Sequence, residues 1–391
     1  MTESSSQPAP LPLQGVVVAD FSRILAGPLC TMVLADLGAD VIKIERPGTG
    51  DDTRTWGPPF VGDDAAYFLS INRNKRSVAL DLALPDDART ARDIADRSDV
   101  LVENFRSDVM DRLGLDHDSV AATNPRLIYC SMPAFAHPES RNRPGYDLMM
   151  QALSGFMSIT GEPGGAPVKI GVAILDVVAG LYAAVGILAA LHERAETGSG
   201  RRIEVGLFEA SVAGLVNQAA NYLIGGTVPT PSGNAHPNIV PYQAFPAKDG
   251  QLVLAAANDK LFGAACRSIG RADLADERRY ATNATRVEHR EELIAEMSGT
   301  FRTATVEHWV AVLSDAGVPA APIRSLDQVF ESPEGRAVLV EAVDPRRGSF
   351  PLVKSPVSFG GDGTVHTPPR LDEHGEEIRA WIRSTPPRGV D

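Results

Sequence analysis

The sequence of 391 residues predicts an α/β fold in which a parallel sheet carries helices on both faces. Short apolar segments alternate with amphipathic ones, as expected when parallel strands are joined by helical crossovers. The first segments form one such unit, with a strand over 15–21, a helix over 26–40 and a second strand over 41–46. The composition, 43% hydrophobic and 22% charged, is typical of a globular protein.

The next segments continue the alternation. SVALDL (77–82) predicts a strand, and Pro85 opens a helix that runs to Asp96. Two more apolar segments, 99–105 and 127–132, predict strands. Residues 201–223 predict a strand that leads into a long helix.

The composition changes near residue 225, where a segment rich in proline and glycine predicts a boundary loop. A strand is expected over 251–257, and 258–316 is expected to be mainly helical. A proline-rich connector follows at 317–325, and the remaining chain predicts a strand, a loop and a short final helix.

Charge and cysteine content narrow the function classes. The net charge of −13 and the pI near 5.1 argue against nucleic acid as a partner, because phosphate binding needs a basic surface. The three cysteines are far apart and show neither CxxC nor zinc spacing, which favours a reducing, cytoplasmic location. Residues 1–14 lack the features of a signal peptide and predict a mobile tail.

The most informative residue is Asp176, the only formally charged residue between Gly171 and Leu191. The run is long enough to be tested as a transmembrane helix, but its central aspartate and two interior glycines favour a buried core helix, and no membrane association is expected. An ionised carboxylate in apolar surroundings is costly without partners. Asp176 should therefore cap a helix, pair with another group, or do chemistry.

Common site motifs are absent from the sequence. The first strand is followed by ADFSRILAGPL rather than GxGxxG, and there is no GxxxxGK[ST], HExxH or GxSxG. No metal site is predicted. Polar residues do recur at predicted strand ends, with Arg46 after one strand and Asn104, Phe105 and Arg106 after another. Ligands of open α/β sheets bind at these ends, and this cluster would suit phosphates.

Long motifs in the same order resemble the family III CoA-transferases, the family that also contains α-methylacyl-CoA racemases. The resemblance covers nearly the whole chain. The segments that carry it are 19–54, 72–82, 99–116, 144–200 and 233–250.

The resemblance implies that Asp176, in the VAxxD motif, is the catalytic nucleophile. It would attack a donor acyl-CoA and form anhydride and aspartyl-CoA thioester intermediates before CoA passes to a carboxylic acid acceptor. CoA thioester is then a substrate, and no permanently bound cofactor is expected. The residues alone leave another role open, in which Asp176 is the N-cap of the helix that follows it.

The resemblance also implies a CoA site. Arg46, Arg106 and Arg112 resemble residues near the nucleotide phosphates, whereas Leu80, Asn104 and Phe105 would line the adenosine and pantetheine channel. Leu25 and Ala26 resemble the segment beside the thioester. Formyl-CoA transferases carry glutamine where Leu25 stands, which argues against oxalate or formate as substrate.

Tyr146 separates two branches of the family. Racemases have a GHD motif where this chain has Gly145, Tyr146 and Asp147. Because tyrosine titrates near pH 10, Tyr146 is a poor general base at neutral pH, and transfer is favoured over racemisation. A racemase or epimerase, or a non-catalytic CoA-binding protein, remains the alternative.

The resemblance finally implies a domain organisation. A Rossmann-like large domain would take 15–225 and 326–391, after the tail over 1–14, and a smaller α+β domain would take 226–325. Two chains are expected to form an interlocked homodimer.

Overall fold

The computed structural model describes residues 10–106, 108–359 and 365–388. Within them the chain forms two compact units. The first contains the chain up to Phe156, Lys169–Thr227, and the chain from Ala337 on, and the second contains Met157–Val168 and Val228–Arg336. The second unit therefore includes 157–168 and 326–336, which differs from the predicted boundaries. Of the predicted tail over 1–14, the first nine residues lie outside the described residues.

The first unit is built on a six-stranded sheet in the order β5-β2-β1-β6-β7-β8, and every neighbouring pair is parallel. In chain order these strands run 3-2-1-4-5-6, the doubly wound arrangement of Rossmann folds. The strands are β1 (Val17–Asp20), β2 (Asp40–Glu45), β5 (Lys75–Ala79), β6 (Val100–Glu103), β7 (Ile128–Ser131) and β8 (Arg201–Glu204).

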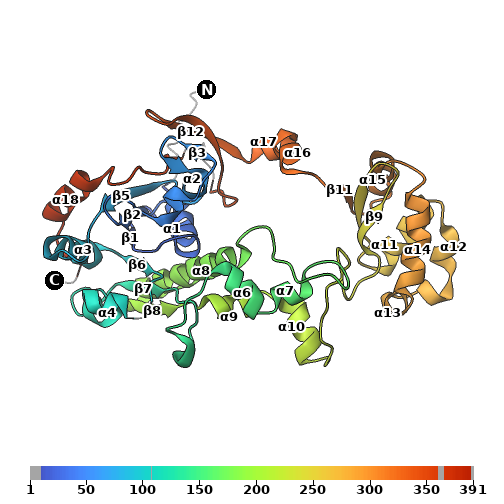
Figure 1. Cartoon of the computed structure of the whole chain (residues 1–391), viewed down its shortest axis with the longest axis horizontal. Helices are drawn as coiled ribbons and strands as arrows, with labels where there is room; N and C mark the ends of the chain where they lie inside the picture. Colours follow the sequence, from blue (N-terminus) through green and yellow to red (C-terminus); the bar gives the residue numbers. More distant parts are fainter. Residues whose placement is uncertain (1–9, 107, 360–364, 389–391) are drawn as a thin grey trace, which may run out of the picture. The chain divides into compact units, whose positions relative to one another are not determined.

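Alternating residues of the strands point to opposite faces of the sheet, and each face has its own core. Val18 and Val100 belong to a core with α1 (Ala26–Asp36) and α8 (Ile174–Thr197). Ala19 and Leu101 belong to a core with α3 (Pro85–Arg97) and α18 (Gly375–Ser384). Figure 1 shows the sheet strands between these two pairs of helices. The predicted parallel α/β architecture is confirmed.

Several short elements complete the first unit. They are β3 (Phe60–Val61), β4 (Asp64–Ala65), α2 (Ala66–Ser70), α4 (Val109–Leu113), α5 (His117–Ala121), α6 (Asp147–Leu153), α7 (Phe156–Ile159), α9 (Leu207–Ala213), α10 (Val216–Leu223), β12 (Leu339–Asp344) and β13 (Gly348–Val353). Of these, α7 begins at the last residue of one stretch of the first unit and continues into the second unit.

Element boundaries differ from the prediction at several places, most clearly at three. The helix expected over 26–40 ends at Asp36, because the chain turns at Gly38 with φ of 102°. The strand expected over 77–82 lies at Lys75–Ala79. The single long helix expected before residue 223 is divided into α9 and α10, with Val216 in the left-handed region at φ of 43°.

The second unit is an α+β structure with a three-stranded antiparallel sheet in the order β11-β10-β9. Helices pack on this sheet around a core that includes Phe245, Phe301 and Trp309. Its elements are β9 (Tyr242–Pro246), β10 (Gln251–Ala255), α11 (Asp259–Ser268), α12 (Ala272–Asp276), α13 (Asn283–Glu288), α14 (Arg290–Phe301), α15 (Val306–Asp315), β11 (Ala320–Pro322), α16 (Leu326–Glu331) and α17 (Pro333–Ala337), the last residue of which belongs to the first unit.

By length and composition alone, α8 is the one helix of the described residues that could cross a membrane. Leu175, Ala179, Ala183 and Ile187 lie on one face of this helix and are buried in the core beside the sheet. The segment that carries Asp176 is therefore part of the packing of the first unit.

Candidate active site

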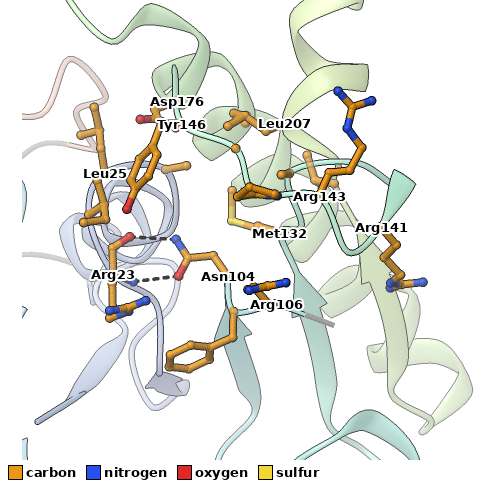
Figure 2. A pocket seen from close by; sticks show the side chains of 18 residues that line it. Arg23, Leu25, Asn104, Arg106, Met132, Arg141, Arg143, Tyr146, Asp176 and Leu207 are labelled. Carbon is orange, nitrogen blue, oxygen red and sulfur yellow. Dashed lines mark hydrogen bonds between the residues drawn. The ribbon is translucent and has the colours of Figure 1, made fainter. Parts of the chain in front are cut away.

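The loops after β1 and β6 lie side by side at the carboxyl ends of the sheet. These two strands are neighbours, and the strand order reverses between them. Such a reversal opens a crevice in which α/β proteins bind their ligands. Here a pocket is lined by the loop after β1, by Asn104–Arg106 after β6, by residues 141–146 and by the first turns of α8 (Figure 2).

The loop after β1 is held in place by side chains from two other strand ends. The Asn104 side chain accepts a hydrogen bond from the Arg23 N–H at 2.9 Å and donates one to the Arg23 carbonyl at 2.8 Å, as Figure 2 shows. The Ile24 N–H donates to the Asp51 carboxylate at 3.3 Å. Ile24 has φ of 71°, rare for a β-branched residue, so the loop depends on these anchors.

A buried ion pair also supports the loop after β1. Lys43 contacts Asp51 at 2.9 Å, and both side chains are almost fully buried. Lys43 also donates to the Ser22 carbonyl at 3.0 Å. Its positive charge keeps the pKa of Asp51 low, at about 2, against the opposing effect of burial, so Asp51 remains an acceptor for the Ile24 N–H.

A second pocket adjoins the first. Arg23 and Phe105 line both, and Arg46 and Leu80 line the second one. Asp52 pairs with both Arg23 and Arg46. The two pockets together offer an apolar surface at Phe105 and Leu80, with guanidinium groups at the edges, which suits an elongated ligand that carries phosphates.

Asp176 lies in the first turn of α8 and lines the first pocket. The N-cap of α8 is Ala173, so the capping role that the sequence left open for Asp176 is wrong. The residue is 9% exposed, and within the described residues its carboxylate accepts no hydrogen bond and pairs with no cation. Burial, followed by the negative charge of Asp147, raises the pKa of Asp176 to about 7.

Gly180 allows α8 to approach α1 one turn after Asp176. A Cβ at this position would lie 2.6 Å from the carbonyl oxygen of Ala26, which is itself in the first turn of α1. The absence of a side chain therefore brings the Asp176 turn close to the start of α1.

Gly180→Ala is expected to destabilise the protein by about 1–3 kcal/mol, because a backbone carbonyl must move to admit the methyl group. The measurement is the free energy of unfolding in urea. Gly186→Ala is the control on the same helix, since its Cβ would meet only the side chain of Ile203. The helix propensity of alanine should make that control neutral or stabilising. Equal stability of the two variants would contradict this account of the close approach.

The structure brings most of the predicted site residues together. Leu25, Ala26, Asn104, Phe105, Arg106, Tyr146 and Asp176 line the first pocket, and Arg46 and Leu80 line the second with Phe105. Arg112 does not line either pocket; it lies on α4 and pairs with Asp108 at 3.4 Å.

Sequence reasoning missed Arg23, Arg141 and Arg143, which also line the first pocket. Arg23 could have been found, because it follows β1 as Arg106 follows β6. The other two lie in a segment without regular periodicity. Arg143 lies 4.7 Å from the ring centre of Phe135, and Arg141 pairs with Glu204. Among the described residues, no group of three or more His, Cys, Asp or Glu side chains is placed to hold a metal ion.

Residues 13–375 match CoA-transferase family III. The chain is 41% identical to a succinate–glutarate CoA-transferase of Agrobacterium fabrum, over 95% of this chain and 96% of that protein. It is 40% identical to the succinyl-CoA:glutarate CoA-transferase of Mus musculus, over 94% of this chain and 85% of that protein. A crystal structure of a CAIB/BAIF family protein from Brucella suis, 42% identical, superposes with a TM-score of 0.82 and covers 96% of this chain and all of that one.

Proposed function

The chain belongs to CoA-transferase family III, and from this membership we propose that it transfers CoA from an acyl-CoA donor to a carboxylic acid through covalent intermediates on Asp176. The observation that carries the proposal is the placement of Asp176, a buried carboxylate without a hydrogen-bonding partner among the described residues, at the edge of a pocket. A carboxylate stripped of water and of partners is available for attack on a carbonyl.

The proposed reaction begins with attack of a carboxylate oxygen of Asp176 on the thioester carbonyl of the donor. The C–S bond breaks, CoA leaves as a thiolate and a mixed anhydride remains. The thiolate then attacks the carbonyl of the Asp176 side chain, releasing the donor acid and leaving an aspartyl-CoA thioester. The acceptor carboxylate attacks the carbonyl of this thioester, the C–S bond breaks, CoA leaves again as a thiolate and a second anhydride forms. Attack of the thiolate on the acceptor carbonyl releases the new acyl-CoA and restores Asp176.

The pocket would protect these intermediates. An anhydride or a thioester on Asp176 is open to hydrolysis wherever water reaches it. Leu25, Ala179 and Leu207 line the pocket with Asp176 and give its surroundings an apolar character. The reaction requires no resident cofactor, since the thioester substrate supplies the activated group.

We place CoA along the two adjoining pockets, with its thioester beside Asp176 and its phosphates near Arg46 and Arg106. Phe105 lines both pockets and would lie along the pantetheine or adenosine part. The Asn104 side chain would act indirectly, because both ends of its amide are bonded to Arg23.

Arg106→Ala and Arg46→Ala are each expected to raise the KM for acyl-CoA by about tenfold with little change in kcat. A charge-assisted contact to a phosphate stabilises the bound substrate and the transition state alike. Steady-state kinetics with varied acyl-CoA provide the measurement. Arg89→Ala is the control, because Arg89 is exposed on α3 and pairs with Asp86 on the same helix. Arg112→Ala in the same assay tests whether Arg112 also contacts the phosphates. Unchanged KM in both pocket variants would refute this placement of CoA.

We further propose that donor and acceptor are dicarboxylic acids or their CoA esters. The relatives above are named for succinyl-CoA or succinate and for glutarate, and a 38% identical relative from Haloarcula marismortui is a succinyl-CoA:mesaconate CoA-transferase. The direct test incubates the protein with succinyl-, acetyl- or branched-acyl-CoA and a panel of dicarboxylates. New acyl-CoA species, measured by liquid chromatography and mass spectrometry, are expected with dicarboxylate acceptors. Hydrolysis alone would rule out transfer.

Racemisation is the second candidate, because the family contains racemases. Tyr146, more than half exposed at the rim of the pocket, stands where racemases have a histidine, which favours transfer. Deuterium uptake at the α-carbon of an acyl-CoA in D₂O, without an acceptor acid, would favour the racemase. CoA binding without turnover of any acid pair would favour a non-catalytic protein.

We also propose that the chain acts as a homodimer. Three helices of the first unit, α6, α8 and α9, contact one another, α10 contacts α9, and the four expose many large apolar side chains. These are Leu148, Met149, Leu153, Leu181, Tyr182, Val185, Val212, Val216, Tyr222, Leu223 and Ile224, with Ile224 87% exposed. Surfaces of this kind are usually covered by a partner, and a second copy would cover it. Light scattering after size-exclusion chromatography should give twice the chain mass, and a monomer would refute the dimer.

A further inference from the structure

The start of α8 is held by two buried side chains of α6, Asp147 and Gln151. One carboxylate oxygen of Asp147 accepts the Leu175 N–H at 2.8 Å, and the other accepts from the Gln151 amide at 2.6 Å. The carbonyl end of the Gln151 amide accepts the Ile170 N–H at 2.8 Å. Asp147 is 8% exposed and Gln151 is fully buried. We call these two residues the α6 clamp.

The α6 clamp supplies what the helix start lacks. The first N–H groups of a helix have no partner within the helix, and a side chain at the N-cap usually accepts one of them. The N-cap of α8, Ala173, cannot do so. Asp147 accepts the N–H of the residue directly before Asp176. Gln151 accepts the N–H of Ile170, in the segment that leads into α8.

We propose that Asp147 and Gln151 are positioning residues for the transfer reaction, because they fix the backbone that carries Asp176 and place a second carboxylate beside it. The inference rests on the proposed role of Asp176 as nucleophile. Neither residue of the α6 clamp is among those that line the first pocket, so they act through Asp176 and not on the substrate.

The charge of Asp147 has a consequence of its own. Together with burial it favours the protonated form of Asp176, and its removal should shift ionisation of Asp176 to lower pH. Two other helices, α9 and α1, contact α8. On α9, Glu209 accepts the backbone N–H of Ala136, and the first turn of α1 carries no acidic residue. The other titratable groups around Asp176 are Tyr67 of α2 and the pocket residues Arg23, Arg106, Arg141, Arg143 and Tyr146.

An exchange of acid and amide tests the α6 clamp. In Asp147→Asn, two amide groups with N–H donors face each other, so the bond to Gln151 is broken or Gln151 must turn away from Ile170. In the double variant Asp147→Asn with Gln151→Glu, the new amide donates to the new carboxylate. That carboxylate can still accept the Ile170 N–H, and the carbonyl end of the introduced asparagine can still accept the Leu175 N–H. The double variant thus keeps these three bonds, loses only the long contact of 3.5 Å from the Gln151 amide to the Val172 carbonyl, and moves the charge by one helical turn.

We expect Asp147→Asn to lower kcat by about 10- to 100-fold with little change in the KM for acyl-CoA, since the reacting carboxylate loses its alignment. The double variant should recover kcat to within about threefold of the original protein, as coupled neighbours do in a double-mutant cycle. In both variants the acidic limb of the kcat/KM profile should move to lower pH. Amide hydrogen exchange over 170–175 should be faster in the single variant and restored in the double one.

The outcomes separate this inference from the proposed function. Unchanged exchange over 170–175 in Asp147→Asn would overturn the clamp, whatever the activity. Loss of kcat in both variants, with equal loss of thermal stability and no shift of the acidic limb, would show a merely structural role and also overturn it. A protein that acts only as a racemase would refute the proposed function and leave the exchange result to decide the clamp.

Discussion

Asp176→Asn is expected to abolish CoA transfer, lowering kcat by at least about 1,000-fold, because removal of a covalent nucleophile leaves only binding and polarisation of the carbonyl. The asparagine amide has nearly the shape of the protonated carboxyl group but cannot form the anhydride. Since Asp176 has no hydrogen bond or ion pair among the described residues, the substitution breaks no contact of the folded protein there.

The affinity for CoA should stay within about twofold in this variant, which separates loss of chemistry from loss of binding. Steady-state rates give the first quantity and isothermal titration with CoA gives the second. Retention of more than about a tenth of the original kcat would remove Asp176 from the centre of the mechanism.

The same substitution is expected to stabilise the folded protein. The pKa of Asp176 is raised from an ordinary 3.8 to about 7 in the folded state. The unfolded chain therefore ionises first as pH rises, and stability is lost progressively from about pH 4 until the folded pKa is passed. Asparagine never ionises and avoids this loss. The gain in unfolding free energy should grow by on the order of 2 kcal/mol between about pH 5.5 and pH 8.

Urea unfolding at the two pH values provides the measurement, with Asp63→Asn as the control at an exposed carboxylate in a turn. That control should change stability little at either pH. Activity should follow the opposite course and rise as pH passes about 7, because only the ionised carboxylate attacks. A stability gain that does not depend on pH would show that Asp176 is not under electrostatic strain. If the stability gain does grow with pH, Asp176 is a residue whose function reduces the stability of the folded protein.

The strands and the buried helix of the first unit could be predicted from the sequence because each has a local signature. Apolar runs mark β1, β2, β6 and β7, and an isolated aspartate in an apolar run marks the buried start of α8. The break between α9 and α10, where Val216 has a positive φ, could not be predicted, since an apolar residue in this conformation is fixed by packing and not by pattern.

The hydrogen bonds that connect residues of the site could not be predicted from the sequence either. Asn104 bonds to Arg23 across 81 positions of the chain, and Asp147 bonds to Leu175 across 28. Hydrogen bonds over such distances leave no periodicity in the sequence. A polar strand end predicted that Asn104 belongs to the site, but not that its amide holds a loop. Arg112 looked equivalent to Arg106 in sequence, and the structure places it on α4 beside Asp108.

The most direct measurement is to trap the intermediate on Asp176. The protein is incubated with succinyl-CoA and hydroxylamine and digested, and the peptide that contains Asp176 is examined by mass spectrometry. A hydroxamate is expected at Asp176; its formation should require acyl-CoA, and it should be absent from Asp176→Asn. Protein that turns over substrate but carries no adduct at Asp176, or that carries it at another carboxylate, would show that Asp176 is not the nucleophile.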